Sequence, residues 1–205
     1  MKIKKLFKVL LVTLPVVVPC ALMNQESDAG MDLTDAGFRK ATWEALDENA
    51  IRIIGKEWML VGAGNVEQGF NMMTASWGGL GWLWEKPVSF IFVRPQRYTH
   101  QFTEREEYYT LTFYDEKYRD VLRKMGTVSG RDFDKINQSG LTPFTTENGS
   151  IGFREARLIL ECRKLYADKI AEKAFTDKAL GEQIYPNKDF HTMYVGEIVN
   201  VWIKE

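Results

Sequence analysis

Cysteine and histidine are scarce in this 205-residue sequence, which has only two of each. Cys20 and Cys162 are too few for a disulfide framework, and neither stands at the spacing of a zinc motif. The two histidines, His100 and His191, lie far apart in the chain. The sequence therefore predicts no metal site, and any chemistry is expected to be that of an organic group.

An excess of basic residues is also absent, since 27 Lys and Arg residues stand against 28 Asp and Glu residues. A nucleic-acid-binding protein needs a cationic surface to neutralise phosphates, so no nucleic-acid partner is expected. The composition, 45% hydrophobic and 27% charged, is typical of a globular protein with one good-sized core. One globular domain is therefore predicted.

The N-terminal apolar run is too short for a comfortable membrane span. It covers fourteen residues from Leu10 to Met23, after a start with four lysines and before a polar segment that contains small residues. This layout is typical of a secretory signal, and we expect residues 1–29 to be removed by cleavage after Ala29. The mature protein would then be periplasmic or envelope-associated, without a transmembrane span.

Two alternatives remain open for this leader. Cys20 follows Val17, Val18 and Pro19, which approaches a lipoprotein site and would give a lipid anchor, although proline is unfavourable there. An internal hydrophobic helix or a misassigned start codon would instead leave the protein in the cytoplasm.

Short apolar runs bounded by Gly, Pro, Asn and charged residues dominate the rest of the chain and predict strands. In one run, Tyr109, Leu111 and Phe113 alternate with two threonines, the period-two pattern of a strand. The predicted strands are Glu57–Ala63, Phe70–Ser76, Val88–Val93, Tyr108–Tyr114, Ala156–Leu165 and Met193–Ile203.

Few helices are expected between these strands. Apolar residues at helical spacing predict a short amphipathic helix over Thr34–Leu46, and further helices over Asp115–Met125 and Asp132–Asn137. Many strands with few helices favour a mainly β protein, an antiparallel barrel with peripheral helices, over a doubly wound parallel sheet. We therefore expect a leader (1–29), an N-terminal helical extension (30–56) and a barrel domain (57–205).

The segment Gly62–Gly69, GAGNVEQG, follows an apolar strand and superficially fits a dinucleotide-binding loop. Such a loop needs a third glycine where Glu67 stands, followed by a helix, whereas Phe70–Trp77 predicts a strand. A β-hairpin with a glycine-rich turn is the better interpretation.

A cluster of polar residues follows the apolar strand VSFIFV. Arg94 and Arg97 carry guanidinium groups, which bind phosphate in a bidentate manner, and the Thr99 hydroxyl can complete an anion site. Upstream, a strand ends in small residues beside Trp77, and small residues let a flat ligand approach the backbone closely. The cluster predicts a site for a flat molecule with a phosphate group.

Three other residues of interest have two interpretations each. Trp82 and Trp84 either pack in the core or belong to the ligand slot, and the sequence does not decide between these. Cys162 lies in the middle of a strand among apolar residues, so an inert buried thiol is favoured over a redox role.

Several motifs, taken in order, resemble the flavin reductase-like family, and within it the flavoredoxin-like branch. The resemblance covers about Trp58 to Ile203 and depends on the combination of motifs. The motifs are Asn71-x-Met73-Thr74-Ala75-Ser76-Trp77, Lys86-Pro87-Val88, Arg94-Pro95-Gln96-Arg97-Tyr98-Thr99, Ser129-Gly130-Arg131-Asp132 with Asp134-Lys135, Leu160-Glu161-Cys162, and His191-x-x-Tyr194-x-Gly196-Glu197.

The resemblance implies an FMN-binding split barrel, antiparallel and Greek-key-like, which is usually a homodimer with the flavin near the subunit interface. The segment Met73–Trp77 would lie along the isoalloxazine ring, the arginines and Thr99 would hold or flank the phosphate, and the loop with Arg131 would close over the site. The cofactor-binding residues that it implies are Asn71, Met73, Thr74, Ala75, Ser76, Trp77, Arg94, Arg97, Tyr98, Thr99, Arg131 and Lys135.

The resemblance also implies a catalytic position for His191, near the exposed flavin face where some members receive the nicotinamide. A strand-edge histidine with satisfied hydrogen bonds is the alternative. The implied activity is an oxidoreductase that passes electrons from NADH, NADPH or a redox partner protein to flavin or another acceptor. The alternatives are an electron-transfer flavoprotein without its own turnover and a non-redox flavin-binding protein.

Overall fold

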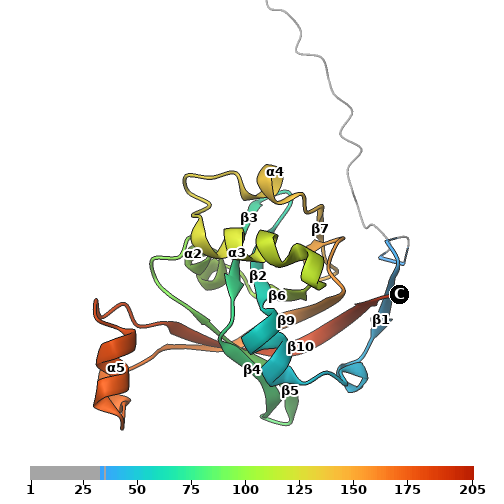
Figure 1. The fold of residues 1–205 in the computed structure, drawn as a ribbon. Coiled ribbons are helices and arrows are strands. Elements are labelled where there is room, and N and C mark those ends of the chain that lie inside the picture. The colour runs from blue at the N-terminus through green and yellow to red at the C-terminus, as the bar shows by residue number, and fades with distance from the viewer. Residues whose placement is uncertain (1–32, 35) are drawn as a thin grey trace, which may run out of the picture.

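The computed structural model describes residues 33, 34 and 36–205, so the predicted leader lies outside the described residues. An antiparallel sheet of eight strands, ordered β3-β2-β6-β9-β10-β5-β4 with β1 paired to β10, curls into an open barrel (Figure 1). A separate hairpin, β7–β8, lies beside it. The strands are β1 (Phe38–Ala41), β2 (Met59–Asn65), β3 (Gly69–Ala75), β4 (Gly78–Leu83), β5 (Lys86–Val93), β6 (Tyr108–Phe113), β7 (Pro143–Thr145), β8 (Ile151–Phe153), β9 (Leu158–Lys169) and β10 (Thr192–Lys204).

The helices are short and lie around this barrel (Figure 1). No helix among the described residues is long and apolar enough to cross a membrane. The helical elements are η1 (Trp43–Ala45), α1 (Ala50–Arg52), the π-helical η2 (Ile53–Glu57), α2 (Thr99–Arg105), η3 (Glu116–Tyr118), α3 (Arg119–Thr127), α4 (Lys135–Ser139), η4 (Glu172–Ala174) and α5 (Lys178–Ile184).

The mainly β, antiparallel architecture predicted from the sequence is confirmed. All six predicted strands occur, as β2, β3, β5, β6, β9 and β10, and every strand pair of the main sheet is antiparallel. The glycine-rich segment is the predicted hairpin, because β2 and β3 pair antiparallel as far as Asn65 and Gly69. Gly64 is needed there, since its φ is +90° and a Cβ would lie 2.3 Å from the Gly69 carbonyl oxygen.

The barrel wall is buried on both faces. Tyr109, Leu111 and Phe113 of β6 point into the barrel core, as their alternation predicted. Thr110, on the opposite face, donates a hydrogen bond at 2.5 Å to the Ile151 carbonyl of the β7–β8 hairpin. A second apolar cluster, which includes Leu60, Met72, Leu122, Met125, Phe144, Phe153 and Trp202, fills the space between the wall, α3 and this hairpin.

The amphipathic helix predicted over Thr34–Leu46 is wrong. Phe38–Ala41 is a strand that pairs with the end of β10, and only one 3₁₀ turn follows it, at Trp43–Ala45. Phe38 is buried while its neighbours Arg39 and Lys40 are exposed. The backbone partner of Phe38 is Lys204, so a contact with the far end of the chain overrides the local helical spacing.

One segment stands apart from the barrel. The strand β9 continues beyond its pairing with β6, which ends at Arg163, and pairs with β10 as far as Lys169 and Thr192. The chain between β9 and β10 forms η4 and α5. We call residues 170–190 the excursion. Figure 1 shows its helix α5 at the end of these two long strands, away from the rest of the molecule.

Candidate functional site

Two adjoining hollows lie at the end of the barrel where β3 and β5 end and β10 begins. The β5–β10 pairing terminates at Val93 and Thr192, which brings Arg94 and His191 to the same end. The first hollow, which we call the open hollow, has a volume of about 220 Å³. It is lined by Met73, Thr74, Ala75, Ser76, Trp77, Phe92, Arg94, Arg97 and His191.

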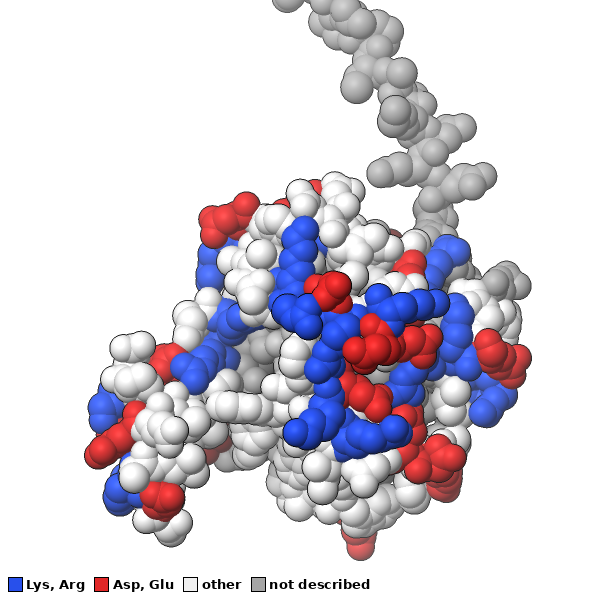
Figure 2. All heavy atoms as spheres, in the orientation of Figure 1, with Lys and Arg blue, Asp and Glu red and all other residues white. Residues whose placement is uncertain are grey.

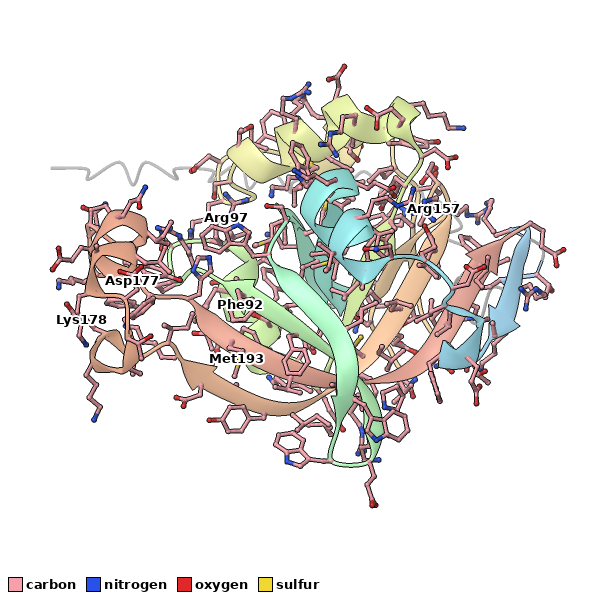
Figure 3. The ribbon with its side chains drawn as sticks, turned by 60° about the horizontal axis from the view of Figure 1, so that its bottom comes forward. Phe92, Arg97, Arg157, Asp177, Lys178 and Met193 are labelled. Carbon is pink, nitrogen blue, oxygen red and sulfur yellow. The ribbon has the colours of Figure 1, made fainter. Side chains whose placement is uncertain are left out.

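The second hollow, which we call the cationic hollow, has a volume of about 180 Å³. Arg97 lines both hollows and so joins them; Figure 3 shows it at the same end of the barrel as Phe92. The lining of the cationic hollow is Gln96, Arg97, Tyr98, Thr99, Thr127, Val128, Ser129, Gly130 and Lys135.

The open hollow has one flat aromatic wall. Trp77 leaves the end of β3 with 45% of its surface exposed, and its ring centroid lies 5.1 Å from that of His191. The neighbouring residues Ala75 and Ser76 are small, which leaves the adjacent backbone accessible. This combination suits a flat ligand whose polar edge meets the backbone.

His191 is neutral at physiological pH. Its pKa is lowered to about 4, first by burial and then by the positive charge of Arg94, against the opposing effect of Asp189. Its Nδ1 atom lies 2.9 Å from the hydroxyl oxygen of Tyr185, which the excursion supplies. The histidine is thus held by a hydrogen bond and packed against Trp77 at the wall of the hollow.

Arg94 holds the excursion against the open hollow. Its guanidinium forms an ion pair with Asp189 and donates a hydrogen bond at 3.0 Å to the Ile184 carbonyl. It also lies over the Tyr185 ring, 5.2 Å from the centroid. Arg94 does not line the cationic hollow, and Asp189 already compensates its charge.

Arg97 and Lys135 converge on the cationic hollow. Both donate to the Met125 carbonyl, at 3.5 and 3.1 Å respectively, while Lys135 also donates to Met72 at 2.7 Å and Arg97 to Gly126 at 2.7 Å. In the part of the chain that the structure describes, neither cation forms an ion pair with a carboxylate. The hollow therefore presents two positive charges to any ligand.

Burial lowers the pKa of both groups. The pKa of Lys135, which is only 5% exposed, falls to about 8, first because of desolvation and then because of Arg97. Desolvation also lowers the pKa of Arg97. Two such groups favour an anion beside them, because an anion would restore the stability of their charged forms.

Asn71 and Thr99 support the cationic hollow from beneath. Both are buried, and the Asn71 side-chain amide donates to the Thr99 hydroxyl at 2.8 Å. A Cβ at Gly130 would lie 2.2 Å from the Asn71 carboxamide oxygen, so this close approach requires glycine. Arg131 lies at the rim, where it donates to the Gln96 carbonyl at 3.1 Å and lines neither hollow.

The structure thus brings most of the predicted site residues together. Those that line neither hollow are Asn71 and Arg131. Sequence reasoning missed Phe92, which lines the open hollow. Phe92 lies on the opposite face of β5 from Ile91 and Val93, and period-two alternation could have predicted this position. Thr127 and Val128 were also missed, although they directly precede the recognised Ser129-Gly130 motif. Tyr185 and Asp189 belong to no sequence motif that could have identified them as partners of His191 and Arg94.

Two further expectations are settled by burial. Cys162 is completely buried and free, and burial raises the pKa of its thiol to about 12, so the inert thiol is confirmed. Core packing of Trp82 and Trp84 is wrong, because they are 60% and 55% exposed. Neither lines a hollow of the site, so both lie on an open surface.

The comparisons with known proteins identify the fold of this site. Residues 51–205 match the family model of the flavin reductase like domain. The structure is similar to an FMN-binding protein from Thermus thermophilus with bound 1-cyclohex-2-enone (23% identity, 72% of this chain and 70% of that chain, TM-score 0.55). It is also similar to flavoredoxin of Desulfovibrio vulgaris (23% identity, 72% and 69%, TM-score 0.57).

A third similar structure is nitrilotriacetate monooxygenase component B from Bacillus cereus (18% identity, 75% of this chain and 72% of that chain, TM-score 0.58). No match was found among curated proteins. At these identities the solved structures show a shared fold, the FMN-binding split barrel. Because the family model matches most of its length, the chain belongs to the flavin reductase like domain family.

Proposed function

We propose that this protein binds FMN across the two hollows and uses it as an oxidoreductase. The observation that carries the proposal is the pair of adjoining hollows that share Arg97, one with a flat aromatic wall and one with two cations that have no carboxylate partner among the described residues. FMN has the matching parts, a flat ring system and a phosphate. Family membership supports the same ligand class.

The donor set of the cationic hollow fits the phosphate. Arg97 and Lys135 lie together without a carboxylate partner in the described chain, which is costly unless an anion joins them. Thr99 and the residues that follow α3, Val128, Ser129 and Gly130, line the same space. A phosphate dianion would therefore complete the charge balance of this hollow.

The residues of the open hollow would hold the ring. In this arrangement Met73–Trp77 runs along the isoalloxazine ring. Arg94 lies beside the ring and keeps its ion pair with Asp189. When bound, FMN supplies hydride and electron transfer, so the protein needs only to bind, orient and shield it.

The donor we propose is a reduced nicotinamide nucleotide or a redox protein, and the acceptor is free flavin or another protein. Nitrilotriacetate monooxygenase component B and flavoredoxin, two proteins of this fold, are consistent with either role. Nicotinamide nucleotides are scarce outside the cytoplasm, so an export leader would favour a protein donor. An electron-transfer flavoprotein without its own turnover is the second candidate. Among the described residues that line the open hollow, the neutral His191 is the only titratable side chain besides the arginines.

A visible absorption spectrum tests the proposal. Purified protein mixed with FMN and freed of excess ligand should stay yellow, and anaerobic NADH or NADPH should then bleach it. A bound yellow colour that neither nucleotide bleaches would favour the electron-transfer role. Protein that remains colourless after FMN is added would refute flavin binding.

A homodimer completes the proposal, and an exposed aromatic surface supports it. Trp43 and Trp82 contact each other with ring centroids 5.4 Å apart, and Trp84 lies 6.3 Å from Tyr166. Trp84 and Glu85 form the β4–β5 turn with φ of 53° and 60°, angles at which glycine or asparagine is usual. All four aromatic residues are more than 40% exposed.

The strand β4 beside this surface ends the sheet, so its outer edge has no neighbouring strand among the described residues. Open edges and large apolar patches are normally covered. Sedimentation equilibrium should therefore give a dimer for the protein and a monomer for a variant with Trp82→Glu and Trp84→Glu. A monomeric parent protein, or a variant that stays dimeric, would contradict this assignment.

A further inference from the structure

Within the described chain, the hydroxyl proton of Tyr185 has a single acceptor within reach. Tyr185 is 4% exposed and packs among Phe175 and Phe190 of the excursion, with ring centroids 6.0 and 4.6 Å away. Over the described residues its oxygen contacts two groups of His191, Nδ1 at 2.9 Å and the backbone N–H, which can only donate. A buried hydroxyl proton without an acceptor costs about 1–3 kcal/mol.

This environment decides which nitrogen of His191 carries the proton. If Nδ1 carried it, Nδ1 would donate to the phenol oxygen and the phenol proton would have no acceptor. If Nε2 carries the proton, Nδ1 accepts the hydrogen bond from Tyr185 and both groups are satisfied. The second arrangement is therefore the more stable one.

The other edge of the His191 ring belongs to the open hollow. His191 lines this hollow beside Trp77, and Nε2 has no hydrogen-bond partner in the described part of the chain. The charged groups that face the ring are Arg94, from the end of β5, and Asp189, from the excursion, and these two pair with each other. Neither competes with Tyr185 for Nδ1.

We propose that Tyr185 is a positioning residue that fixes His191 as the neutral Nε2–H tautomer, so that Nε2 presents an N–H donor to a flavin in the open hollow. The proposal rests on the proposed function. It gives the excursion a role, because Arg94 anchors the segment that carries Tyr185. The histidine then acts as a hydrogen-bond donor to an electron-rich ring atom without becoming a cation.

Nitrogen-15 NMR of the histidine side chains tests this directly, because the sequence has only two histidines and a His100→Asn variant assigns them. In flavin-free protein at pH 7, His191 should show the Nε2–H tautomer with a preference on the order of tenfold. Tyr185→Phe keeps the aromatic packing and should reduce the preference to less than about threefold. Tyr166→Phe, which removes an exposed hydroxyl elsewhere, should change nothing.

An Nδ1–H tautomer in the parent protein, or an unchanged preference in Tyr185→Phe, would overturn the proposal. The second arm adds FMN, with binding followed independently by flavin fluorescence. The His191 Nε2 resonance should shift when FMN binds, and bound FMN with an unmoved resonance would also overturn the proposal. Absence of FMN binding refutes the proposed function instead, while the flavin-free spectra still decide whether Tyr185 fixes the tautomer.

Discussion

The open hollow and the cationic hollow share Arg97 but differ in what they offer a ligand. Trp77 in the open hollow is 45% exposed, and two polar side chains there already have partners, Arg94 with Asp189 and the Nδ1 atom of His191 with Tyr185. In the cationic hollow, Lys135 is 5% exposed and has no carboxylate partner among the described residues. The open hollow thus selects by shape and the cationic hollow by charge.

The cations of the cationic hollow also differ from the cations on the protein surface. Figure 2 shows basic and acidic side chains mixed over the face that α3 crosses, so most surface cations have acidic neighbours. Arg97 and Lys135 lack them within the described chain. We therefore expect changes in the cationic hollow to affect FMN alone, and changes in the open hollow to affect FMN and riboflavin equally.

The largest effect is expected for Arg97→Ala. Loss of a charge-assisted hydrogen bond to the phosphate should weaken FMN by about 1.5–3 kcal/mol, on the order of ten- to a hundredfold, and leave riboflavin nearly unchanged. Flavin fluorescence measures both dissociation constants. Arg131→Ala, at the rim, is the matched control and should have little effect. Equal losses of FMN and riboflavin would mean that Arg97 is structural.

The next effect is a pH dependence that belongs to FMN alone. The folded-state pKa of Lys135 is about 8, lowered by burial and by Arg97, so the lysine loses its charge as pH rises through that value. A bound phosphate favours the charged form, so FMN binding takes up a proton in this range. FMN should weaken by on the order of tenfold between about pH 7.5 and 9.5, while riboflavin stays constant.

Lys135→Met provides the control for this pH dependence. The variant should bind FMN more weakly at pH 7.5 and show no further loss toward pH 9.5. Parallel weakening of FMN and riboflavin in the parent protein would assign the effect to the fold rather than to the phosphate.

A smaller effect, shared by both ligands, is expected for Trp77→Ala. An aromatic contact contributes about 0.5–1.5 kcal/mol, so FMN and riboflavin should each weaken by roughly two- to tenfold. The ratio of the two dissociation constants serves as the internal control and should not change. A loss confined to FMN would remove Trp77 from the ring-binding wall.

The smallest effect concerns stability in acid. The pKa of His191 is lowered to about 4 in the folded state, so below about pH 6.5 the unfolded chain binds a proton that the folded protein does not. Proton binding to the unfolded chain at this group therefore lowers the free energy of unfolding as pH falls, by about 1 kcal/mol between pH 7 and 5.5.

Urea unfolding of the parent protein and of His191→Asn at the two pH values measures this contribution. The variant should lose about 1 kcal/mol less than the parent over this interval. Identical pH profiles for the parent and His191→Asn would show that the histidine is freely protonated in the folded protein.

Much of the barrel and of the open hollow was predictable because their signals are local. Period-two alternation gave the strands, and Arg94 and His191 meet because β5 and β10 are adjacent antiparallel strands whose pairing ends at Val93 and Thr192. The strand β1 was missed because its register depends on Lys204, at the other end of the chain. The spacing of residues within a segment cannot predict a strand partner so far away in the sequence.

The same limit applies to the partners of Arg94 and to the tryptophans. Asp189 compensates the charge of Arg94 from the excursion, which has no recognisable motif. The sequence therefore could not separate this arginine from Arg97, which has no carboxylate partner in the described chain. Trp82 belongs to a glycine-rich edge strand, where alternation does not tell a buried face from an exposed one.

The central claim is that the phosphate of FMN occupies the cationic hollow while the ring occupies the open one. Parallel titration of flavin-free protein at pH 7 with FMN and with riboflavin, followed by fluorescence, tests it most directly. The account predicts that FMN binds more tightly by on the order of ten- to a hundredfold, the contribution of charge-assisted hydrogen bonds to the phosphate. Equal affinities for the two flavins, or no binding of either, would contradict it.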